Sequence, residues 1–137
     1  SSSLRRWLNE TFYEEAFDGE EQAKILETSL KNPINSSYGM TGGNDTVDHV
    51  FLLCISEARS YFDTIDARQA ANSSYVRGQR KKELNETYNG WWLRSPGEER
   101  NKAAYIDSNG VIRYAGTDIR NETIGIRPVI WIDLSVE

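Results

Sequence analysis

The chain has one cysteine and one histidine, so the first chemical question is whether they could form a nucleophile and its base. Cys54 lies in the apolar run VFLLCI, and His49 precedes it by five residues. On an extended strand, residues an odd number of positions apart point to opposite faces. We therefore expect Cys54 to be a small buried hydrophobic residue and not a nucleophile. A single cysteine also rules out a disulfide within the chain.

Metal chemistry is limited by the same scarcity of ligands. A zinc site built without several Cys or His residues would need carboxylates for nearly all of its ligands. Calcium needs only oxygen ligands, and Asn44, Asp45 and Asp48 supply them within one glycine-rich loop. Asx turns explain these three residues equally well, so both interpretations stay open. We predict no cofactor and no catalytic residue.

Acidic residues are the remaining source of chemistry, because the chain has 21 Asp and Glu and a net charge of −5. A hydrolase needs only two of them, placed across a cleft. Glu14-Glu15 and Glu20-Glu21 lie at expected helix ends, where acids near an N-terminus interact favourably with the positive end of the helix dipole. The negative charge argues against nucleic acid or an anionic membrane as the main partner. No apolar run is long enough to span a bilayer, so we expect no membrane insertion.

Helices are expected to come first along the chain, which at 137 residues fits one domain, 1–137. The first helix would begin after Ser3 as N-cap, with apolar residues at helical spacing. These residues are Leu4, Trp7, Leu8 and Phe12. A second helix would begin at Asp18, which forms a capping-box pair with Glu21. Its apolar side would be Ala23, Ile25 and Leu26, and it would end before Asn32-Pro33.

The middle of the chain alternates polar loops with one apolar run. Residues 32–48 read as a long loop, of the kind that is more often functional than idle. Residues 49–55 have the length and composition of a strand buried on both faces. A short helix capped by Ser56 should follow, then another turn or two over 64–71. The basic stretch within 72–90 predicts an excursion over the surface.

The last third is strand-like, which together with the helices predicts an α+β fold. The expected strands are 91–95, 103–107, 111–116 and 124–134, with a hairpin turn at 107–110. The adjacent Trp91 and Trp92 should point to opposite faces of their strand, which Pro96-Gly97 would end.

Two arginines in apolar surroundings and two further tryptophans should have structural roles. Arg94 and Arg127 would act as structural clamps that tie loop carbonyls together, because a guanidinium among apolar residues must find acceptors. We expect Trp7 and Trp131 in the core.

Asparagine is frequent in N-x-[S/T] patterns. These begin at Asn9, Asn35, Asn44, Asn72, Asn85 and Asn121. In a eukaryotic secreted protein they would be glycosylation acceptors. We interpret them as polar turn chemistry, and glycosylation is the alternative.

Several blocks of the chain together resemble a bacterial domain-of-unknown-function family that recurs in surface and secreted proteins of gut-associated bacteria. The blocks are LRRWLNETFYEEAFDGEEQAKI, DHVFLLCISEARSYF, WWLRSPG, AAYIDSNGVIRYAG and GIRPVIWIDL, in this order from Leu4 to Leu134. The family's WWLRSPG and GVRPAL-type blocks are similar to those of C-type-lectin-like folds of the formylglycine-generating-enzyme branch. Retroelement-diversified variable proteins belong to the same branch.

The resemblance implies a C-type-lectin-like fold, with two N-terminal helices packed on a small twisted antiparallel sheet with long loops. It implies that the side chains between the two arginine motifs face a ligand, and an extracellular or cell-surface location. The implied ligand-binding residues are Glu98, Glu99, Arg100, Asn101, Lys102, Arg113, Tyr114, Thr117, Asp118, Arg120, Asn121 and Glu122. Their mixture of Tyr, Arg and Asn is typical of adaptable binding surfaces, although a solvated hairpin would also account for it.

The enzymes of this branch use metal sites that the chain cannot supply. Formylglycine-generating oxidases hold copper with a cysteine pair, and the sulfoxide-forming iron enzymes use three histidines, whereas this chain has one of each residue. We therefore expect a non-catalytic module that binds a protein or glycan. The alternatives are a spacer or interaction domain of a larger exported protein, and a carboxylate-dependent hydrolase.

One expectation concerns the last strand. Lectin-like folds pair an N-terminal strand with the C-terminal one, and this sequence begins with a helix. The run IGIRPVIWIDL would then keep an open apolar edge. We expect either residues upstream of Ser1 or a neighbouring molecule, for example in a homo-oligomer, to cover that edge.

Overall fold

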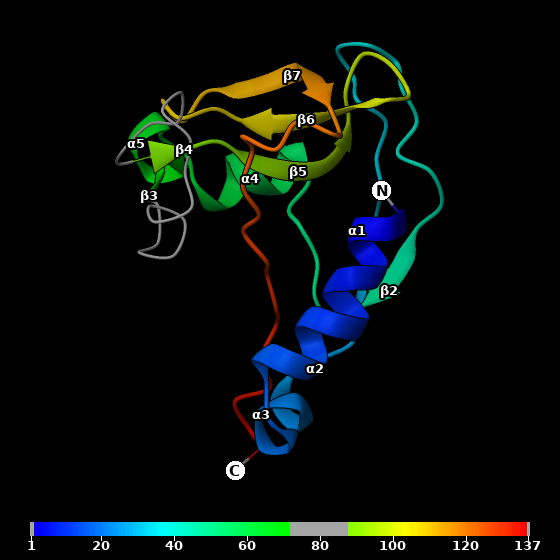
Figure 1. Ribbon diagram of the computed structural model, residues 1–137, viewed down its shortest axis with the longest axis vertical. Helices are drawn as coiled ribbons and strands as arrows, with labels where there is room; N and C mark the ends of the chain where they lie inside the picture. Colours follow the sequence, from blue (N-terminus) through cyan, green and yellow to red (C-terminus); the bar gives the residue numbers. More distant parts are fainter. Residues whose placement is uncertain (1, 72–87, 137) are drawn as a thin grey trace.

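A computed structural model describes residues 2–71 and 88–136 of the chain. The N-terminal helices lie toward one end of the molecule, and a three-stranded sheet lies at the other end, with two short helices and a small two-stranded sheet beside it (Figure 1). Two extended segments run between the ends, one leading into α4 and one leading to the C-terminus (Figure 1). The combination of helices with antiparallel sheets confirms the α+β class.

The N-terminal helix is continuous through α1 (Ser2–Trp7), the π-helical stretch η1 (Leu8–Phe12) and α2 (Tyr13–Ala16). It already includes Ser2, so the prediction that Ser3 caps it was wrong. Leu8 is buried, with Leu4 and Phe12 packed beside it. Trp7 is 42% exposed, contrary to the expectation of a core residue. The inward side chains are spaced four residues apart, and Trp7 lies at their margin with its ring centroid 5.5 Å from that of Phe12.

The second helix, α3 (Gly19–Lys24), begins as the sequence predicts and ends earlier. Its capping box is present: Glu21 N–H donates to the Asp18 carboxylate at 2.8 Å, and Asp18 N–H donates to the Glu21 carboxylate at 2.9 Å. The predicted continuation through Ile25 toward Asn32 was wrong. Ile25 is instead buried in a β-bridge with Ile132, which removes it from the helical register.

Strand β1 (Thr28–Leu30) follows, and it pairs antiparallel with β2 (Thr46–Asp48). The residues between these strands form the predicted long loop, whose last three predicted positions are β2. Asn35 fixes this loop to the rest of the fold, because its buried side-chain amide donates to the carbonyls of Pro96 and Tyr114, both at 2.8 Å. The loop therefore lies against the three-stranded sheet.

The apolar run after β2 is buried on all sides, as predicted, but it is not a strand. Residues 50–54 are all buried, and the only β-bridge among them joins Phe51 to Val129. Side chains of other segments satisfy much of its backbone: Asn9 bonds His49 and Val50, and Arg94 bonds the Leu52 carbonyl. These side chains, together with backbone bonds to Val129 and Arg94, take the place of a continuous neighbouring strand.

The helices that follow are short. Helix α4 (Ile55–Tyr61) has Cys54 as its N-cap residue, not Ser56 as predicted, because Cys54 N–H donates to the Glu57 carboxylate at 2.9 Å. Cys54 is buried and unpaired, which confirms the expectation of a small buried residue. Helix α5 (Ile65–Arg68) confirms the predicted turn over 64–71. Strands β3 (Ala70–Ala71) and β4 (Tyr88–Asn89) pair. The predicted surface excursion lies almost entirely outside the described residues.

The main sheet is an antiparallel meander of β5 (Trp91–Pro96), β6 (Lys102–Ile106) and β7 (Ile112–Asp118). The predicted hairpin turn joins β6 to β7, and Gly110 there has a φ of +85° that suits glycine. Trp91 and Trp92 point to opposite faces, as predicted. Trp91 belongs to the core cluster around Leu53 and Ile106, whereas Trp92 belongs to the cluster under the N-terminal helix.

The C-terminal segment was predicted to be a strand and is not one. It makes three separate bridges, in which Gly125 pairs with Trp91, Val129 with Phe51 and Ile132 with Ile25. Its three partners belong to different elements, and Pro128 lacks an N–H to donate, so no continuous ladder forms. Trp131 is 48% exposed, which contradicts its expected place in the core.

Candidate functional site

The predicted ligand-binding residues begin in the turn between β5 and β6, and the backbone of that turn is well fixed. Gly97 N–H donates to the Lys102 carbonyl at 2.9 Å, and Glu98 N–H donates to the Ala115 carbonyl of β7 at 2.9 Å. A Cβ on Gly97 would lie 2.4 Å from the Ala115 carbonyl oxygen, so only glycine allows this approach. The turn is consequently held against β7.

The end of β7 brings more of the predicted residues to the same place. Lys102 is paired with Asp118 in the register of β6 and β7, and Ile119 N–H donates to the Asn101 carbonyl at 3.0 Å. Arg120 folds back on Asp118 through Nε at 3.0 Å and Nη2 at 2.9 Å. We call residues 98–102 and 117–122 the recognition end of the sheet.

Two predicted residues lie away from the recognition end. Arg113 is at the other end of β7, where its Nε donates to Asp107 at 2.7 Å beside the hairpin turn. Tyr114 lies between the two ends, is half-buried, and accepts the Asn35 amide at its backbone carbonyl. The structure thus brings together the remaining predicted residues, namely Glu98, Glu99, Arg100, Asn101, Lys102, Thr117, Asp118, Arg120, Asn121 and Glu122.

Charges of both signs alternate over the recognition end. The hydrogen bonds from Arg120 hold the pKa of Asp118 well below its usual range, and Asp118 raises the pKa of Arg120 in return. A hydrogen bond to Glu98 raises the pKa of Lys102. These groups stay ionised at neutral pH, so the surface offers fixed donors and acceptors to a polar ligand.

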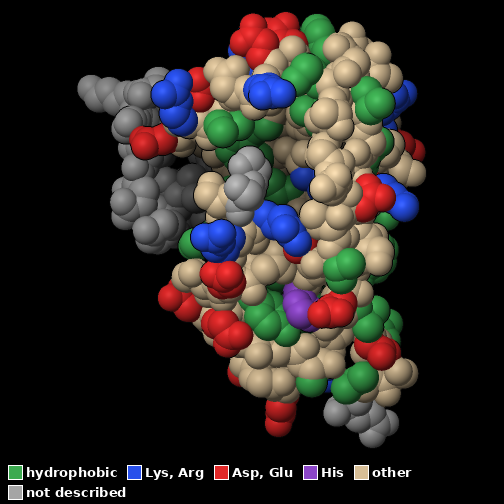
Figure 2. All heavy atoms as spheres, turned by 90° about the vertical axis from the view of Figure 1, so that its right-hand side faces the viewer, with side chains coloured by type: hydrophobic (Ala, Val, Ile, Leu, Met, Phe, Trp, Pro, Cys, Tyr) green, Lys and Arg blue, Asp and Glu red, His purple; other side chains and the backbone are tan. Residues whose placement is uncertain are grey.

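A pocket of about 400 Å³ opens beside the recognition end, and sequence reasoning missed it. Its apolar wall includes Leu4, Trp92, Ala103 and Ile119, and the last two join it to the recognition end. Figure 2 shows this face of the molecule, hollowed near its centre, with hydrophobic side chains inside the hollow and Lys or Arg side chains around it. We call it the N-terminal pocket, because Ser3, Leu4 and Arg5 form one side of it.

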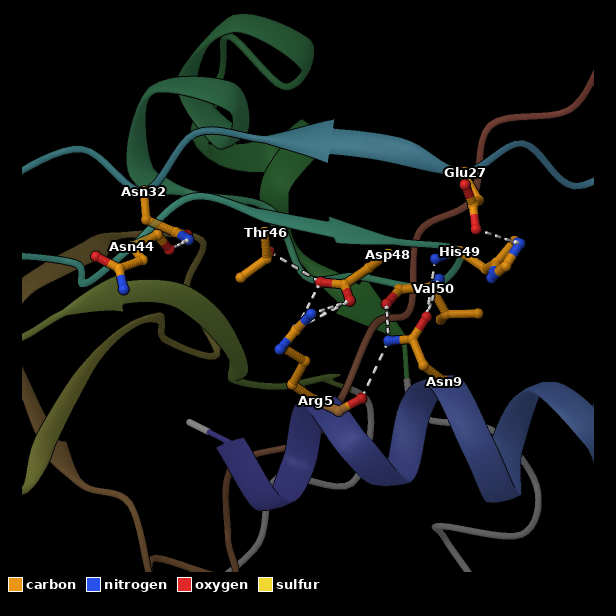
Figure 3. Close-up of polar contacts among 9 residues, drawn as sticks. All are labelled: Arg5, Asn9, Glu27, Asn32, Asn44, Thr46, Asp48, His49 and Val50. Atoms are coloured by element: carbon orange, nitrogen blue, oxygen red, sulfur yellow. Dashed lines mark hydrogen bonds and ion pairs between the residues drawn. The ribbon is translucent and has the colours of Figure 1, made fainter.

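The polar wall of the N-terminal pocket is an ion pair between α1 and β2. Arg5 Nε donates to both carboxylate oxygens of Asp48, at 2.8 and 2.9 Å, and Thr46 Oγ1 donates to the same carboxylate at 3.0 Å (Figure 3). The hydrogen bond to Asp48 raises the pKa of Arg5. Because Asp48 is only 6% exposed, this pair fixes the start of the helix on the strand.

Asn9 and Asn32 hold the two sides of this region in place. The Asn9 side chain accepts from the N–H groups of His49 and Val50 and donates to the Val50 carbonyl at 2.8 Å (Figure 3). The Asn32 side chain donates to the Asn44 carbonyl at 2.7 Å. Asn9 and Arg5 are four residues apart, so helical spacing was the one signal in the sequence that placed them on a common face.

The carboxylates once considered for calcium are bound to cations of the chain itself. Asp45 accepts from Lys31 Nζ at 3.1 Å and from Asn32 N–H at 3.0 Å, and these bonds lower its pKa. Asp48 is held by Arg5. Across residues 2–71 and 88–136, no group of three Asp, Glu, His or Cys residues is placed to hold a metal ion.

Arg94 forms the inner wall of the N-terminal pocket and is the clamp that the sequence predicts. It donates to the Lys31 carbonyl at 2.7 Å, the Leu52 carbonyl at 2.8 Å and the Asn32 side chain at 3.1 Å, and it pairs with Glu57. Burial opposes ionisation of Glu57, but the bonds from Arg94 and Cys54 N–H outweigh it and lower the pKa of Glu57.

Comparison with known proteins now adds a family to this geometry. The model of a domain of unknown function, DUF6273, matches residues 1–134. The chain belongs to the DUF6273 family. No curated protein and no solved structure matches it. In the described part of this DUF6273 chain, no helix has both the length and the apolar character needed to cross a membrane.

Proposed function

We propose that this DUF6273 domain is a non-catalytic ligand-binding module of a bacterial surface or secreted protein, and that its ligand is a protein or a glycan. One observation carries the proposal: ten of the predicted ligand-binding residues gather at the recognition end of the sheet, directly beside the N-terminal pocket. Mixed charges and amides next to an apolar recess suit a ligand with polar groups around an apolar portion.

The frame behind the recognition end supports this proposal. Trp91 and Trp92 fill the two faces of β5, and Arg94 connects the strand to the long loop at Lys31 and to the stretch from Leu52 to Glu57. A stiff frame lowers the entropy cost of ordering a binding surface. A polar turn on such a frame can therefore recognise a ligand without rearranging.

We also propose that the fold is C-type-lectin-like. Helices precede the antiparallel meander, and long irregular segments fill much of the chain. The two arginine motifs meet at Trp91, which forms a bridge with Gly125 and lies under the Arg127 guanidinium at 4.8 Å. An experimental structure would test this proposal, and a different strand order in the main sheet would contradict it.

The test of the binding function is an array of bacterial and host glycans and surface proteins, followed by calorimetric titration of any hit. Arg120→Ala removes a charged donor of the recognition end, so it should weaken binding at least tenfold. Within the described residues Arg120 bonds only to Asp118, so the same substitution should leave the melting temperature unchanged. Asn101→Ala should act similarly. Arg59→Ala, on the exposed face of α4, is the matched control. Unchanged affinity in both recognition-end variants would contradict the proposal.

A second candidate, an interaction domain within a larger protein, is favoured by the exposed apolar side chains of the C-terminal segment. Trp131, Ile132 and Leu134 are 48, 49 and 92% exposed. Such a stripe suits a protein partner, including a second copy of this chain. Sedimentation velocity should then detect an oligomer that Leu134→Glu dissociates, whereas a monomer at all concentrations would remove the homo-oligomer from consideration.

Nothing specific favours the hydrolase. The carboxyl groups whose pKa is shifted in the described part of the chain are Asp45, Glu57, Asp118 and Asp133, and all four pKa values are lowered. A general acid needs a raised pKa, so these four groups are unsuited to that role.

A further inference from the structure

A second pocket, of about 380 Å³, lies at the opposite end of β5 from the recognition end. Its walls come from α4, from the buried segment after β2 and from the C-terminal segment. The lining residues are Leu53, Tyr61, Phe62, Trp91, Arg127, Pro128, Val129 and Ile130. Among these described lining residues, which are otherwise apolar or aromatic, Arg127 is the one that carries a charge.

Within the described part of the chain, the Arg127 guanidinium contacts two aromatic rings and forms no hydrogen bond. Its Cζ atom is 4.8 Å from the Trp91 ring centroid and 5.2 Å from that of Phe62. Its Nη1 atom is buried and has no hydrogen-bond partner within residues 2–71 and 88–136. Aromatic faces attract a cation, but they do not satisfy five N–H donors. The expected clamp on loop carbonyls was therefore wrong for Arg127, although the residue does lie on the frame.

Two other partly buried arginines have the hydrogen-bond acceptors that Arg127 lacks within the described residues. Arg94 pairs with Glu57, and Arg68 donates to the carbonyls of Gly110 and Phe62 at 2.8 and 2.9 Å. Burial lowers the pKa of Arg127, and no acidic group of residues 2–71 and 88–136 offsets this effect. Arg127 is partly buried, and a buried nitrogen such as its Nη1 atom is costly to the fold without an acceptor. An anion that reached Nη1 from the pocket would remove that cost.

We propose that this second pocket binds a hydrophobic carboxylate, whose carboxyl group pairs with Arg127 and whose aryl or branched alkyl group lies against Tyr61, Pro128 and Ile130. A carboxylate matches the planar fork of a guanidinium, and its one charge balances that of Arg127, the cation among the described lining residues. The apolar walls favour a hydrophobic acid over a compact anion such as phosphate. The volume suits a small organic ligand. This proposal is independent of the recognition end.

A free organic acid and the C-terminal residue of a peptide share this chemistry, and the experiment separates them. The probes are 3-phenylpropionate and N-acetyl-Gly-Phe, each compared with its primary amide, in ¹H–¹⁵N NMR titrations of the whole chain. At least one acid should cause saturable shifts of the Trp91 indole N–H, which donates to the Arg68 carbonyl beside the pocket. Its amide should bind at least tenfold more weakly, because it lacks the charge-assisted pair.

Substitutions assign the binding to the pocket. Arg127→Gln should abolish binding of the acid, whereas Arg113→Gln, at a surface arginine paired with Asp107, should preserve it. Tyr61→Ala changes a side chain that is mostly exposed, so it keeps the test valid if Arg127→Gln does not fold. It should weaken 3-phenylpropionate severalfold. Absence of saturable binding by both acids, equal binding of the amides, or unchanged binding in these two pocket variants would each overturn the proposal.

Discussion

Replacement of Arg94 by methionine is the sharpest test of the frame, because this one side chain joins three segments that are distant in sequence. Its guanidinium bonds the carbonyls of Lys31 and Leu52 and the side chains of Asn32 and Glu57. The side chain is 13% exposed. Methionine keeps an unbranched apolar side chain but removes all of these donors, together with the guanidinium whose Cζ lies 6.0 Å from the Phe51 ring centroid.

The expected cost follows from which partners water can reach after the substitution. Lys31 is exposed and Asn32 half-exposed, so water can replace Arg94 at both. Leu52 is buried, and its unsatisfied carbonyl should cost about 1–2 kcal/mol. Glu57 keeps 27% exposure, so its uncompensated charge should cost about 1–2 kcal/mol, less than a fully buried ion would. We expect Arg94→Met to lower the free energy of unfolding by about 3 kcal/mol, or the melting temperature by roughly 10 °C.

Urea unfolding followed by tryptophan fluorescence measures this loss, and a double variant tests its cause. Adding Glu57→Gln to Arg94→Met removes the uncompensated charge, so the double variant should recover about 1 kcal/mol relative to Arg94→Met alone. Arg120→Met removes an exposed arginine that also pairs with a carboxylate, and it should have no measurable effect. An Arg94→Met protein within about 0.5 kcal/mol of the wild type would refute the clamp.

Three further predictions concern other parts of the frame. The native pKa of Glu57 lies below its ordinary value of 4.5, so the folded state binds fewer protons than the unfolded state as the pH falls. The stability difference between wild type and Glu57→Gln should therefore be largest at neutral pH and shrink as the pH falls below 4.5. Urea midpoints measured from pH 3 to 7 check this. Asn9→Ala removes three hydrogen bonds to the backbone of the buried run and should cost about 2–3 kcal/mol, whereas Asn44→Ala, at an exposed loop position, should cost little. Gly116 has a φ of +75°, and a Cβ there would lie 2.2 Å from the Ala103 carbonyl oxygen. Gly116→Ala should therefore lower the free energy of unfolding by more than about 2 kcal/mol in the same assay. A Cβ on Gly19 would meet no atom within 4 Å, so Gly19→Ala should be neutral or stabilising.

Local sequence signals predicted the parts of the fold that depend on neighbouring residues. The capping box of Asp18 and Glu21, the hairpin turn that ends at Gly110 and the opposite orientations of Trp91 and Trp92 each follow from residues a few positions apart. Most of the predicted ligand-binding residues lie close together, since one turn and one strand end contain nearly all of them, and their role in binding stays a prediction. Only Arg113 and Tyr114 lie elsewhere, because β7 carries them away from its end.

The two apolar runs at 49–55 and 124–134 could not be assigned from their composition. Hydrophobicity indicates that a segment is buried, but whether it becomes a strand depends on a partner with free backbone groups. In the first run, the side chains of Asn9 and Arg94 bond several of the backbone groups. The second run forms single bridges with three different segments, one after another. The N-terminal pocket escaped prediction because its walls come from at least five stretches of the chain. Trp131 was misplaced because it lies beyond Pro128, where the chain leaves the main sheet.

The recognition end depends on a residue far from it in the sequence. Asn35 donates to the carbonyl of Pro96, which lies 61 positions away and directly precedes the turn between β5 and β6. It also donates to the carbonyl of Tyr114, which directly precedes the part of β7 that bonds this turn. Asn35 begins an N-x-[S/T] pattern, yet its side chain is buried at 2% exposure and both amide hydrogens are committed to these carbonyls. A glycan on this amide would replace one of the two donating hydrogens and has no room at a buried side chain, so the structural use of Asn35 excludes its glycosylation in the folded domain. The same two bonds couple the long loop to the recognition end.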